Sequence, residues 1–288
     1  MSSVQPMSSV QPMSSVVWID GRLHDEPEAR ISPFDHGLLT GDGVFETLCV
    51  YRGVPFAVRR HLQRLVRSCM GLRLACPDPG VLRPAMDEVV AANGLVEGRL
   101  RITVTGGVSP LGSDRGTSGP SIIVAGAPLG TWPPAADVAV VPWPRNEQGA
   151  LSGLKTISYG ENVVALAYAR ERGAGEAVFA NTRGELCEGT GSNVFVAVDG
   201  RLVTPPLSSG CLAGVTRALV LETVGAGEED LPVAALARSS EAFLTSTTRQ
   251  VQPIRSVDGK SLPAPVPGPL TAAAIEAFAE LAATDLDP

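Results

Sequence analysis

Hydrophobic positions alternate or recur at helical spacing along most of the chain, in two stretches separated by a Pro- and Gly-rich segment. In the first stretch, residues 43–56 alternate around an Arg-Gly turn, which is typical of a β-hairpin. Leu62, Leu65 and Cys69 recur at helical spacing and predict a helix with a basic outer face. The other elements predicted here are a hairpin at 16–23, a helix at 79–93 and strands at 100–106 and 121–127.

The second stretch shows the same mixture of strands and helices. Residues 161–173 have helical periodicity and stop at Gly173, a residue type that commonly ends helices. Residues 240–254 read as one strand that runs into a Ser/Thr-rich loop. The remaining predictions are a strand at 138–143, hairpins at 176–189 and 192–206, and helices at 214–224 and 269–283. Hairpins with interspersed helices predict an α+β chain of two mixed domains with largely antiparallel sheets.

The periodic pattern breaks at two places. The segment 128–137 is rich in Gly and Pro, so we expect a linker between a small N-terminal domain at 17–127 and a C-terminal domain at 138–288. Residues 1–16 repeat the hexapeptide Met-Ser-Ser-Val-Gln-Pro and lack the basic and apolar regions of a signal peptide. We expect this tag-like repeat to be disordered and to lie outside the fold.

Composition excludes several classes of protein. With 288 residues, 44% of them hydrophobic and 18% charged, the chain fits a globular protein and not a disordered one. Its net charge of −7 argues against a general nucleic-acid surface, and no apolar run reaches the ~20 residues that a membrane helix needs. The five cysteines are scattered without a C-x-x-C pair, so neither a disulfide framework nor a metal site is expected, and free thiols fit a reducing cytoplasm.

Lysine is rare in this chain, and one lysine lies in an apolar setting. Of the 23 Lys and Arg residues, two are lysine, Lys155 and Lys260. Arginine stays protonated, whereas a desolvated lysine can act as an amine nucleophile toward a carbonyl. Lys260 lies in an Asp-Gly turn, as expected of a surface residue, but Lys155 has Leu154 and Ile157 as neighbours. The residues alone leave two interpretations of Lys155 open, a catalytic amine and a surface lysine.

Other segments offer polar groups for a phosphorylated heterocyclic ligand. Thr216 lies at the start of a predicted helix, where free N–H groups favour a phosphate. Four hydroxyls follow one another at 245–248, and Arg64 lies on the basic helix. Glu188 precedes a Gly-Thr-Gly turn, where a carboxylate could keep a ring nitrogen protonated. Each segment alone fits an ordinary cap, turn or solvated surface, but with Lys155 they form the set of groups needed at a pyridoxal phosphate site.

Six ordered motifs over residues 17–285 resemble those of the class IV aminotransferases, the fold-type IV pyridoxal phosphate enzymes. GDGVFE, at 41–46, resembles the N-terminal strand of the family. HLQRL, GLKT and CEGTGSNVF resemble its phosphate-arginine helix, its lysine strand and its pyridine-nitrogen motif, which implies these roles for Arg64, Lys155 and Glu188. LAGVTR and LTSTT resemble its two phosphate loops and imply cofactor contacts from Leu212, Val215, Thr216, Ser246 and Thr247.

The resemblance also implies an architecture and a chemistry. The family has a small N-terminal α/β domain and a larger C-terminal domain with a barrel-like sheet. The cofactor, pyridoxal 5′-phosphate, lies between the two domains, and a homodimer completes each site. By resemblance, Lys155 forms the Schiff base and moves a proton between substrate and cofactor, while Glu188 keeps the pyridine nitrogen protonated.

Three activities of the family are open to this chain. Its TSTTRQVQPI and GDGVFET segments look closest to the transaminases that move an amino group from D-amino acids or (R)-amines to a 2-oxo acid. Aminodeoxychorismate lyase and L-branched-chain aminotransferase are the alternatives. A non-catalytic pyridoxal phosphate-binding protein is the least favoured, because it would have no chemical reason to keep Lys155 and Glu188.

The substrate residues follow less directly from the resemblance. The D-amino-acid branch commonly has an arginine and a histidine in a loop where this chain has Leu111 and Ser113. The substrate carboxylate therefore needs another cation. Arg101 lies on a predicted strand, which fixes its side-chain direction, and is preferred to Arg249 or Arg115. The expected substrate site consists of Phe45, Thr47, Arg101 and Arg249.

Overall fold

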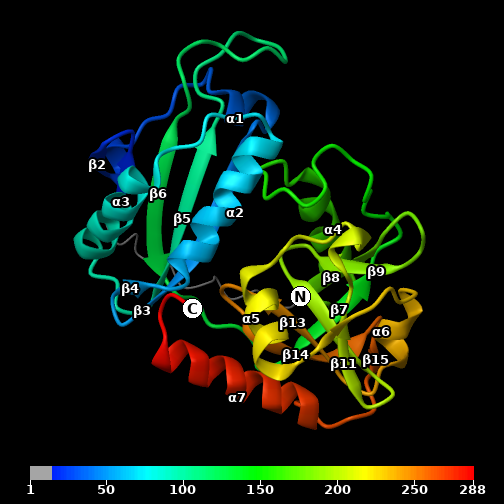
Figure 1. Cartoon of the computed structure of the whole chain (residues 1–288). Helices are drawn as coiled ribbons and strands as arrows, with labels where there is room; N and C mark the ends of the chain where they lie inside the picture. Colours follow the sequence, from blue (N-terminus) through cyan, green and yellow to red (C-terminus); the bar gives the residue numbers. More distant parts are fainter. Residues whose placement is uncertain (1–14) are drawn as a thin grey trace, which may run out of the picture.

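The computed structural model describes residues 15–288, which form two halves, each built on its own sheet (Figure 1). Most of the predicted N-terminal repeat lies outside the described residues, but Val16, at its end, already belongs to strand β1 (Val16–Ile19). Strand β6 (Ile122–Pro128) is the last of the first half, and β7 (Ala136–Val140) opens the second. The chain therefore passes from the first half to the second between Pro128 and Ala136.

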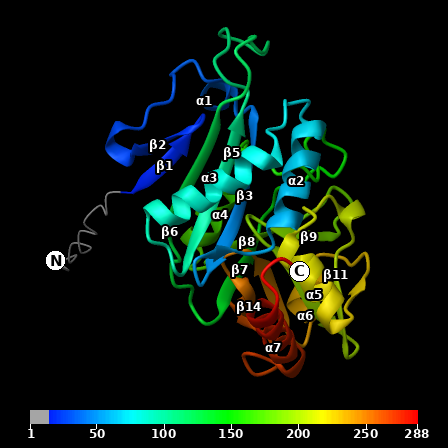
Figure 2. The ribbon, with the colours of Figure 1, turned by 60° about the vertical axis from the view of Figure 1, so that its left-hand side comes forward.

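An antiparallel sheet of six strands forms the N-terminal half, in the order β2-β1-β6-β5-β3-β4. Besides β1 and β6, its strands are β2 (Arg22–Asp25), β3 (Gly43–Tyr51), β4 (Val54–Pro55) and β5 (Gly98–Thr105). Two helices, α2 (Val58–Gly71) and α3 (Pro79–Ala92), cover one face of the sheet, and the short helix α1 (His36–Thr40) precedes β3 (Figure 2). The predicted hairpins, helices and strands of this half are confirmed.

The two-residue period of β-strands gives this sheet two different faces. Its core under α2 and α3 contains alternate residues of β3 and β5, namely Val44, Leu48, Val50, Leu100, Ile102 and Val104. The residues between them, including Phe45, Thr47 and Arg101, belong to the opposite face. Thr47 pairs with Arg101 across β3 and β5, so this face places a ring, a hydroxyl and a cation side by side.

A barrel-like sheet of nine strands forms the C-terminal half, in the order β12-β11-β10-β13-β14-β7-β8-β9, with β15 paired to β14. Its further strands are β8 (Glu176–Ala180), β9 (Leu186–Gly189), β10 (Asn193–Val198), β11 (Arg201–Thr204), β12 (Gly227–Glu228), β13 (Ala242–Ser246), β14 (Gln250–Val257) and β15 (Lys260–Ser261). Three pairings are parallel, β7 with β14, β7 with β8, and β11 with β12. The antiparallel expectation thus holds throughout the first sheet and for most pairs of the second.

Helices cover this second sheet on both sides. α4 (Gly160–Glu171) packs the small residues Ala165 and Ala169 against β7 and β8. α5 (Val215–Val224) and α7 (Pro269–Thr284) pack together on another part of the sheet, with α7 along the bottom of Figure 1. The short helix α6 (Ala234–Arg238) lies beside β10 and β14.

The two halves are joined where the end of the chain returns to the first half. Phe278 of α7 meets Phe56 edge-on, with ring centres 6.0 Å apart. Beyond α7, the carbonyl of Leu286 accepts a hydrogen bond from the N–H of Ala57, at 2.7 Å. These contacts fix the open face of the first sheet over loops of the second half.

One prediction for the second half was wrong. The segment after β13 was expected to be a loop, but it turns tightly and becomes strand β14. Gln250 adopts a positive φ of 56° at this turn, which lets the chain reverse direction within four residues. Within residues 15–288, no helix is long and apolar enough to cross a membrane, and no group of acidic, His or Cys side chains has the arrangement of a metal site.

Candidate active site

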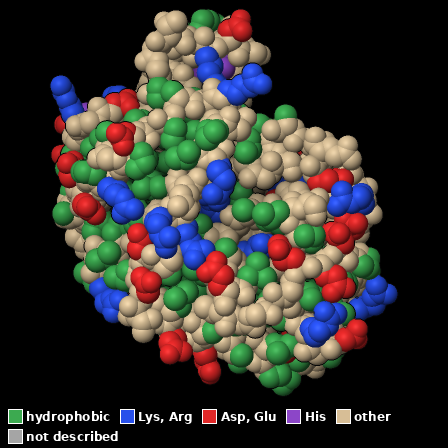
Figure 3. Space-filling model, viewed as in Figure 1, with side chains coloured by type: hydrophobic (Ala, Val, Ile, Leu, Met, Phe, Trp, Pro, Cys, Tyr) green, Lys and Arg blue, Asp and Glu red, His purple; other side chains and the backbone are tan. Residues whose placement is uncertain are grey.

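A cavity of about 960 Å³ lies between the two halves. The open face of the first sheet supplies Phe45, Thr47 and Arg101, and α2 supplies Arg64. Helix α1 and the residue after it line one side with Gly37, Leu38, Thr40 and Gly41, and the remaining lining comes from segments of the second half, at 145–162, 188–193, 210–217 and 245–248. The cavity therefore collects the segments whose polar groups the sequence analysis selected, although they are far apart along the chain. The face of the molecule drawn in Figure 3, by contrast, carries charges of both signs interspersed among hydrophobic side chains.

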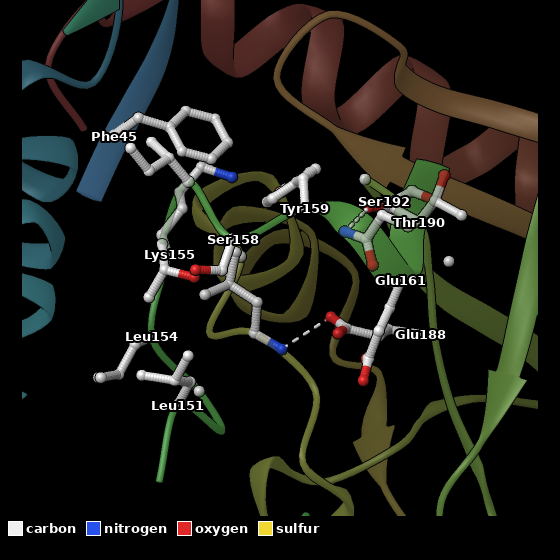
Figure 4. A pocket seen from close by; sticks show the side chains of 18 of the residues that line it. Phe45, Leu151, Leu154, Lys155, Ser158, Tyr159, Glu161, Glu188, Thr190 and Ser192 are labelled. Carbon is white, nitrogen blue, oxygen red and sulfur yellow. Dashed lines mark hydrogen bonds between the residues drawn. The ribbon is translucent and has the colours of Figure 1, made fainter. Parts of the chain in front are cut away.

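Lys155 lies on an extended segment beside the start of β3. Its carbonyl accepts a hydrogen bond from the N–H of Phe45 at 3.0 Å, and its own N–H donates to Ser68 Oγ at 3.1 Å. Lys155 Nζ lies 4.4 Å from the centre of the Phe45 ring (Figure 4). Burial, followed by the positive charge of Arg64, lowers the pKa of Lys155 to about 8. The neutral amine, which is the nucleophile, is therefore far more populated near neutral pH than for an exposed lysine.

Glu188 faces the same cavity from β9 (Figure 4). Its Oε2 accepts a hydrogen bond from the backbone N–H of Leu212 at 2.9 Å, and Arg145 Nε lies 3.2 Å from Oε1. Burial raises the pKa of Glu188, while the charge of Arg145 and the Leu212 hydrogen bond oppose that effect. A carboxylate so placed can accept a hydrogen bond from a protonated ring nitrogen in the cavity.

Arg64 is fixed in the cavity wall by a buried ion pair. Its Nε and Nη2 donate to the two oxygens of Glu46, at 2.8 and 2.7 Å, and His61 Nδ1 lies 2.7 Å from the same carboxylate. Burial alone would raise the pKa of Glu46, but the charge of Arg64 and the hydrogen bonds from Arg64 and His61 hold that pKa well below its usual range. The remaining Nη1 donates to the carbonyl of Ala213, next to helix α5, at 3.0 Å.

The predicted phosphate loops meet at the N-terminus of α5. This helix begins at Val215, and no side chain caps its first N–H groups. Gly214, which precedes it, lies so close to Asn193 that an added Cβ would stand 2.0 Å from Asn193 Oδ1. All five residues predicted for these loops line the cavity, namely Leu212, Val215, Thr216, Ser246 and Thr247. Uncapped N–H groups at a helix N-terminus favour an anion, so this end of the cavity suits a phosphate.

Arg101 differs from the other cations of the cavity. Its guanidinium lies over the Phe45 ring, with Cζ 3.7 Å from the ring centre, and its Nε donates to Thr103 Oγ1 at 3.2 Å. Within the described part of the chain, no carboxylate forms an ion pair with Arg101, whereas Arg64 and Arg145 both have acidic partners. Arg101 is therefore a cation available to an anionic ligand.

Two other arginines are engaged elsewhere, which corrects the expectation for Arg249. Arg249 does not line the cavity, because its Nη2 forms a buried ion pair with Glu176 at 3.0 Å and its guanidinium stacks on Trp132, 3.8 Å from the ring centre. Arg115 pairs with Asp42 and holds the loop that follows β5. Leu111, at the tip of that loop, is 74% exposed, and Ser113 lies beside Arg115 and outside the cavity.

Sequence reasoning missed two residues of the site. Tyr159 packs edge-on against Phe45, with ring centres 5.2 Å apart, and burial raises its pKa to about 12. Arg145 lines the cavity behind Glu188. Tyr159 lies four residues after Lys155 and Arg145 ten residues before it, in loops without periodicity. Proximity in sequence to Lys155 is the one signal that could have selected them.

The residues present fit pyridoxal 5′-phosphate. The uncapped start of α5 and Arg64 would take the phosphate, Glu188 the ring nitrogen, and Lys155 the aldehyde carbon. Arg145 Nε is buried without an aligned hydrogen-bond acceptor and lies 3.2 Å from Glu188 Oε1, so its charge backs the carboxylate that would meet the ring nitrogen. The cavity thus brings together a cation, a carboxylate and an amine. These groups match the three functional parts of the cofactor, which are its phosphate, its ring nitrogen and its aldehyde.

Comparisons with known proteins agree with this arrangement. The family model described as amino-transferase class IV matches residues 43–257. The chain is 32% identical over 283 residues to a putative branched-chain-amino-acid aminotransferase of Methanocaldococcus jannaschii, covering 92% of this chain and 96% of that protein. It is 31% identical over 285 residues to the D-alanine aminotransferase of Staphylococcus haemolyticus, covering 91% and 96%.

A third relative combines two activities, and a solved structure shares the fold. The chain is 30% identical over 274 residues to the bifunctional aminodeoxychorismate lyase / D-amino acid transaminase of Mycobacterium tuberculosis, covering 86% of this chain and 93% of that protein. The T.th. branched-chain amino acid aminotransferase, solved with pyridoxamine 5′-phosphate, is similar with a TM-score of 0.84 and 26% identity, covering 93% and 95%.

Proposed function

Because the chain belongs to the amino-transferase class IV family and is a pyridoxal phosphate enzyme, we propose that it transfers an amino group from a D-amino acid, or from an (R)-amine, to a 2-oxo acid. An amino donor and a 2-oxo acid are the substrates of this family. The finer assignment to D-amino acids draws support from the D-alanine aminotransferase relative and from the free cation in the cavity. The hand of the substrate is the part of the proposal that the experiment below decides.

Each side chain of the site has a proposed task. When bound, pyridoxal phosphate supplies an aldehyde that condenses with amines and a ring that accepts the electrons of a broken C–H bond. Lys155 is the amine that holds the cofactor and then carries the proton removed from the substrate α-carbon. Glu188 accepts the hydrogen bond of the ring nitrogen, and Arg64 with the N-terminus of α5 holds the phosphate. The five residues of the two phosphate loops keep the ring in register for proton transfer.

The observation that carries the substrate assignment is the unpaired guanidinium of Arg101. Arg101 and Lys155 both stack on the Phe45 ring, so a donor whose amine reaches Lys155 can place its carboxylate against Arg101. Thr47, opposite Arg101 in the sheet, adds a hydroxyl to this subsite. We propose that these three N-terminal residues, Phe45, Thr47 and Arg101, recognise the donor, and that Arg249 does not.

A half-reaction screen tests the proposal. Purified enzyme loaded with cofactor is mixed with D-alanine, L-leucine or (R)-1-phenylethylamine, and the change in cofactor absorption is followed. D-alanine should react faster than L-leucine, because the proposal gives the amino donor the D hand, as in the D-alanine aminotransferase relative. Faster reaction with L-leucine would instead place the enzyme among the L-branched-chain aminotransferases.

The variant Arg101→Gln sharpens this screen. Loss of a charge-assisted partner costs roughly 1.5–3 kcal/mol, so kcat/KM for D-alanine should fall by about ten- to a hundredfold. (R)-1-phenylethylamine has no carboxylate and should be nearly unaffected, which separates loss of recognition from general damage. Arg99→Gln is the matched control, because Arg99 is an exposed residue of β5, the strand that carries Arg101. Arg249→Gln does not serve as one, because it would leave the buried Glu176 without its partner. An equal loss with both donors would contradict the role of Arg101.

Aminodeoxychorismate lyase is the second candidate. It is supported by the Mycobacterium tuberculosis relative, whose name joins this activity to D-amino acid transamination in one chain. Both reactions need a lysine that moves a proton and a cation for a carboxylate, so the same residues would serve. Formation of 4-aminobenzoate from aminodeoxychorismate by an enzyme inert to all amine donors would make the lyase reaction the function.

We also propose that two copies of the chain associate over the mouth of the cavity and that the protein is cytoplasmic. Leu38 and Leu151, from opposite sides of the mouth, are 71% and 42% exposed, and Phe34 and Leu111 nearby are also exposed. Exposed apolar side chains of this size are typical of an interface. The five cysteines are free thiols, as in a reducing compartment. A monomer by light scattering at micromolar concentration would contradict the homodimer.

The two halves are further proposed to be separate domains, 17–127 and 138–288, joined by the linker 128–137. The support is that each half has its own sheet and its own hydrophobic core. Limited proteolysis should cut first within the linker if this division is right.

A further inference from the structure

Arg145 lies behind Glu188 and is held by four neighbours. Its backbone N–H donates to the carbonyl of Ala180 at 2.7 Å, which fixes it to the edge of β8. Its guanidinium lies over the Phe179 ring, with Cζ 4.1 Å from the ring centre. Nη1 lies 3.1 Å from Glu161 Oε2 and Nη2 donates to Asn162 Oδ1 at 2.8 Å, so two nitrogens are held by α4.

The third nitrogen of Arg145 faces Glu188. Nε lies 3.2 Å from Glu188 Oε1, and both side chains are largely buried, at 16% and 14% exposure. The Glu188 carboxylate thus has Arg145 on one oxygen and the Leu212 N–H on the other. Glu188 also lines the cavity, so its carboxylate remains accessible on the side where the ring nitrogen of the cofactor would lie.

The other ionisable groups around Glu188 cannot replace Arg145. Tyr159, Cys187 and Cys211 are close enough to feel its charge, but burial raises the pKa of each of them, so they are neutral at neutral pH. Lys155 is the other cation whose charge acts on the pKa of Glu188, and it does so less strongly than Arg145. Its amine is the group proposed to react, so its charge changes during the reaction, whereas that of Arg145 does not.

We propose that Arg145 is a positioning residue that holds Glu188 as an anion, directed at the pyridine nitrogen. This inference rests on the proposed function of the site as a pyridoxal phosphate centre. A buried carboxylate without a cation takes up a proton. A protonated Glu188 would donate a hydrogen bond to the ring nitrogen and leave it unprotonated, which would weaken the ring as an electron acceptor. Arg145 prevents this without touching the substrate.

The test compares neutral and charged replacements of Arg145 in the cofactor-loaded enzyme. Arg145→Gln and Arg145→Met remove the charge in two ways, so that a folding defect in one leaves the other, and Arg145→Lys restores the charge. Arg172→Gln is the matched control, because Arg172 also stacks on an aromatic ring, Tyr168, but lies outside the cavity. The readouts are the pH titration of the cofactor absorption band without substrate, the acid limb of kcat/KM for D-alanine, and the Kd of pyridoxal phosphate.

The neutral variants should move the acid transition of the absorption band, and the acid limb, upward by about 1–3 pH units, because that is the usual effect of an adjacent arginine on a carboxyl group. Arg145→Lys should lie between wild type and Arg145→Gln, and Arg172→Gln should match the wild type. A transition at the wild-type pH in the neutral variants, even with lower activity or a higher Kd, would overturn the proposal and leave Arg145 a packing residue. A wild type without a cofactor band would instead refute the proposed function itself.

Discussion

At the scale of single residues, the cations of the cavity fall into two groups, those with a carboxylate as ion-pair partner and those without one. The buried cations Arg64 and Arg145 are matched by Glu46 and Glu188, so they are fixed in place. Lys155 and Arg101 have no ion-pair partner within residues 15–288, and both stack on Phe45. The paired cations suit holding a cofactor, and the unpaired ones suit meeting a substrate.

The first prediction concerns the identity of residue 155. Lys155→Ala and Lys155→Arg should both abolish turnover, because alanine has no amine and a guanidinium stays protonated. Lys260→Arg is the matched control and should retain full activity, since Lys260 is an exposed residue of the short strand β15. Borohydride treatment of the loaded enzyme and peptide mapping should label residue 155. Label on residue 260 would show that the wrong lysine had been chosen.

The second prediction concerns pH. The pKa of Lys155 is lowered to about 8, so the amine is protonated below that pH and neutral above it. The rate at which cofactor-free enzyme captures pyridoxal phosphate should therefore rise with pH, reach half its limit near pH 8 and level off above it. Stopped-flow absorbance measures this rate. A rate still rising steeply at pH 10 would mean that Lys155 has the pKa of an ordinary exposed lysine.

The residues that line the cavity could be predicted from the sequence where a motif surrounds them. They could not be predicted where their position depends on the fold alone. Lys155, Glu188, Arg64 and the phosphate loops were placed in one cavity as expected. Arg249 was not, because a tight turn directs its side chain toward Glu176 and away from the cavity. The partner of an arginine depends on which distant carboxylate the fold brings near, and sequence spacing does not contain that information. Arg145 was missed for the same reason.

At the scale of elements, the end of the cavity proposed to bind the phosphate depends on the junction between a strand and a helix. β10 begins with Asn193, whose Nδ2 donates to the carbonyl of Leu212 at 2.8 Å, just before α5. Gly214 allows this loop to pass against Asn193. The helix itself was predictable from its periodicity, but β14 was not, because a Ser/Thr-rich turn hides a strand that follows it directly.

The third prediction tests this junction. Gly214→Ala would place a Cβ 2.0 Å from Asn193 Oδ1, so the loop before α5 must shift. The Kd for pyridoxal phosphate should rise by about tenfold or more, equivalent to about 1.4 kcal/mol. Gly130→Ala is the control, because a Cβ there would meet no atom within 4 Å. Equal cofactor affinity of the two variants by equilibrium dialysis would contradict the importance of this loop.

At the scale of the whole molecule, the cavity exists because the two halves are held against each other. A shared hydrophobic cluster joins them, with Cys49 and Phe56 from the first half and Phe278 from α7. Leu286 adds a backbone hydrogen bond to Ala57 at the start of α2. Helix α2 also carries Arg64, so the same element serves the junction at its start and the proposed phosphate site about two turns later.

The fourth prediction follows from that junction. Phe278 is 3% exposed, and Phe278→Ala should lower the free energy of unfolding by about 3–5 kcal/mol, through lost burial and the cavity left behind. Chemical denaturation followed by circular dichroism measures this change. Val96→Ala, at a position that is 65% exposed, should change stability by less than about 0.5 kcal/mol. Similar midpoints for the two variants would show that α7 does not stabilise the junction.

The alternation along β3 and β5 has a consequence for how this enzyme can diversify. Residues that stabilise the first half and residues proposed to meet the donor occupy opposite faces of the same two strands. Point substitutions at Phe45, Thr47 or Arg101 can therefore change substrate preference while the core under α2 and α3 keeps its packing. Insertion of one residue into either strand would exchange the two faces and destroy both. Substrate specificity can therefore evolve by substitutions within β3 and β5, but not by insertion or deletion of single residues in these strands.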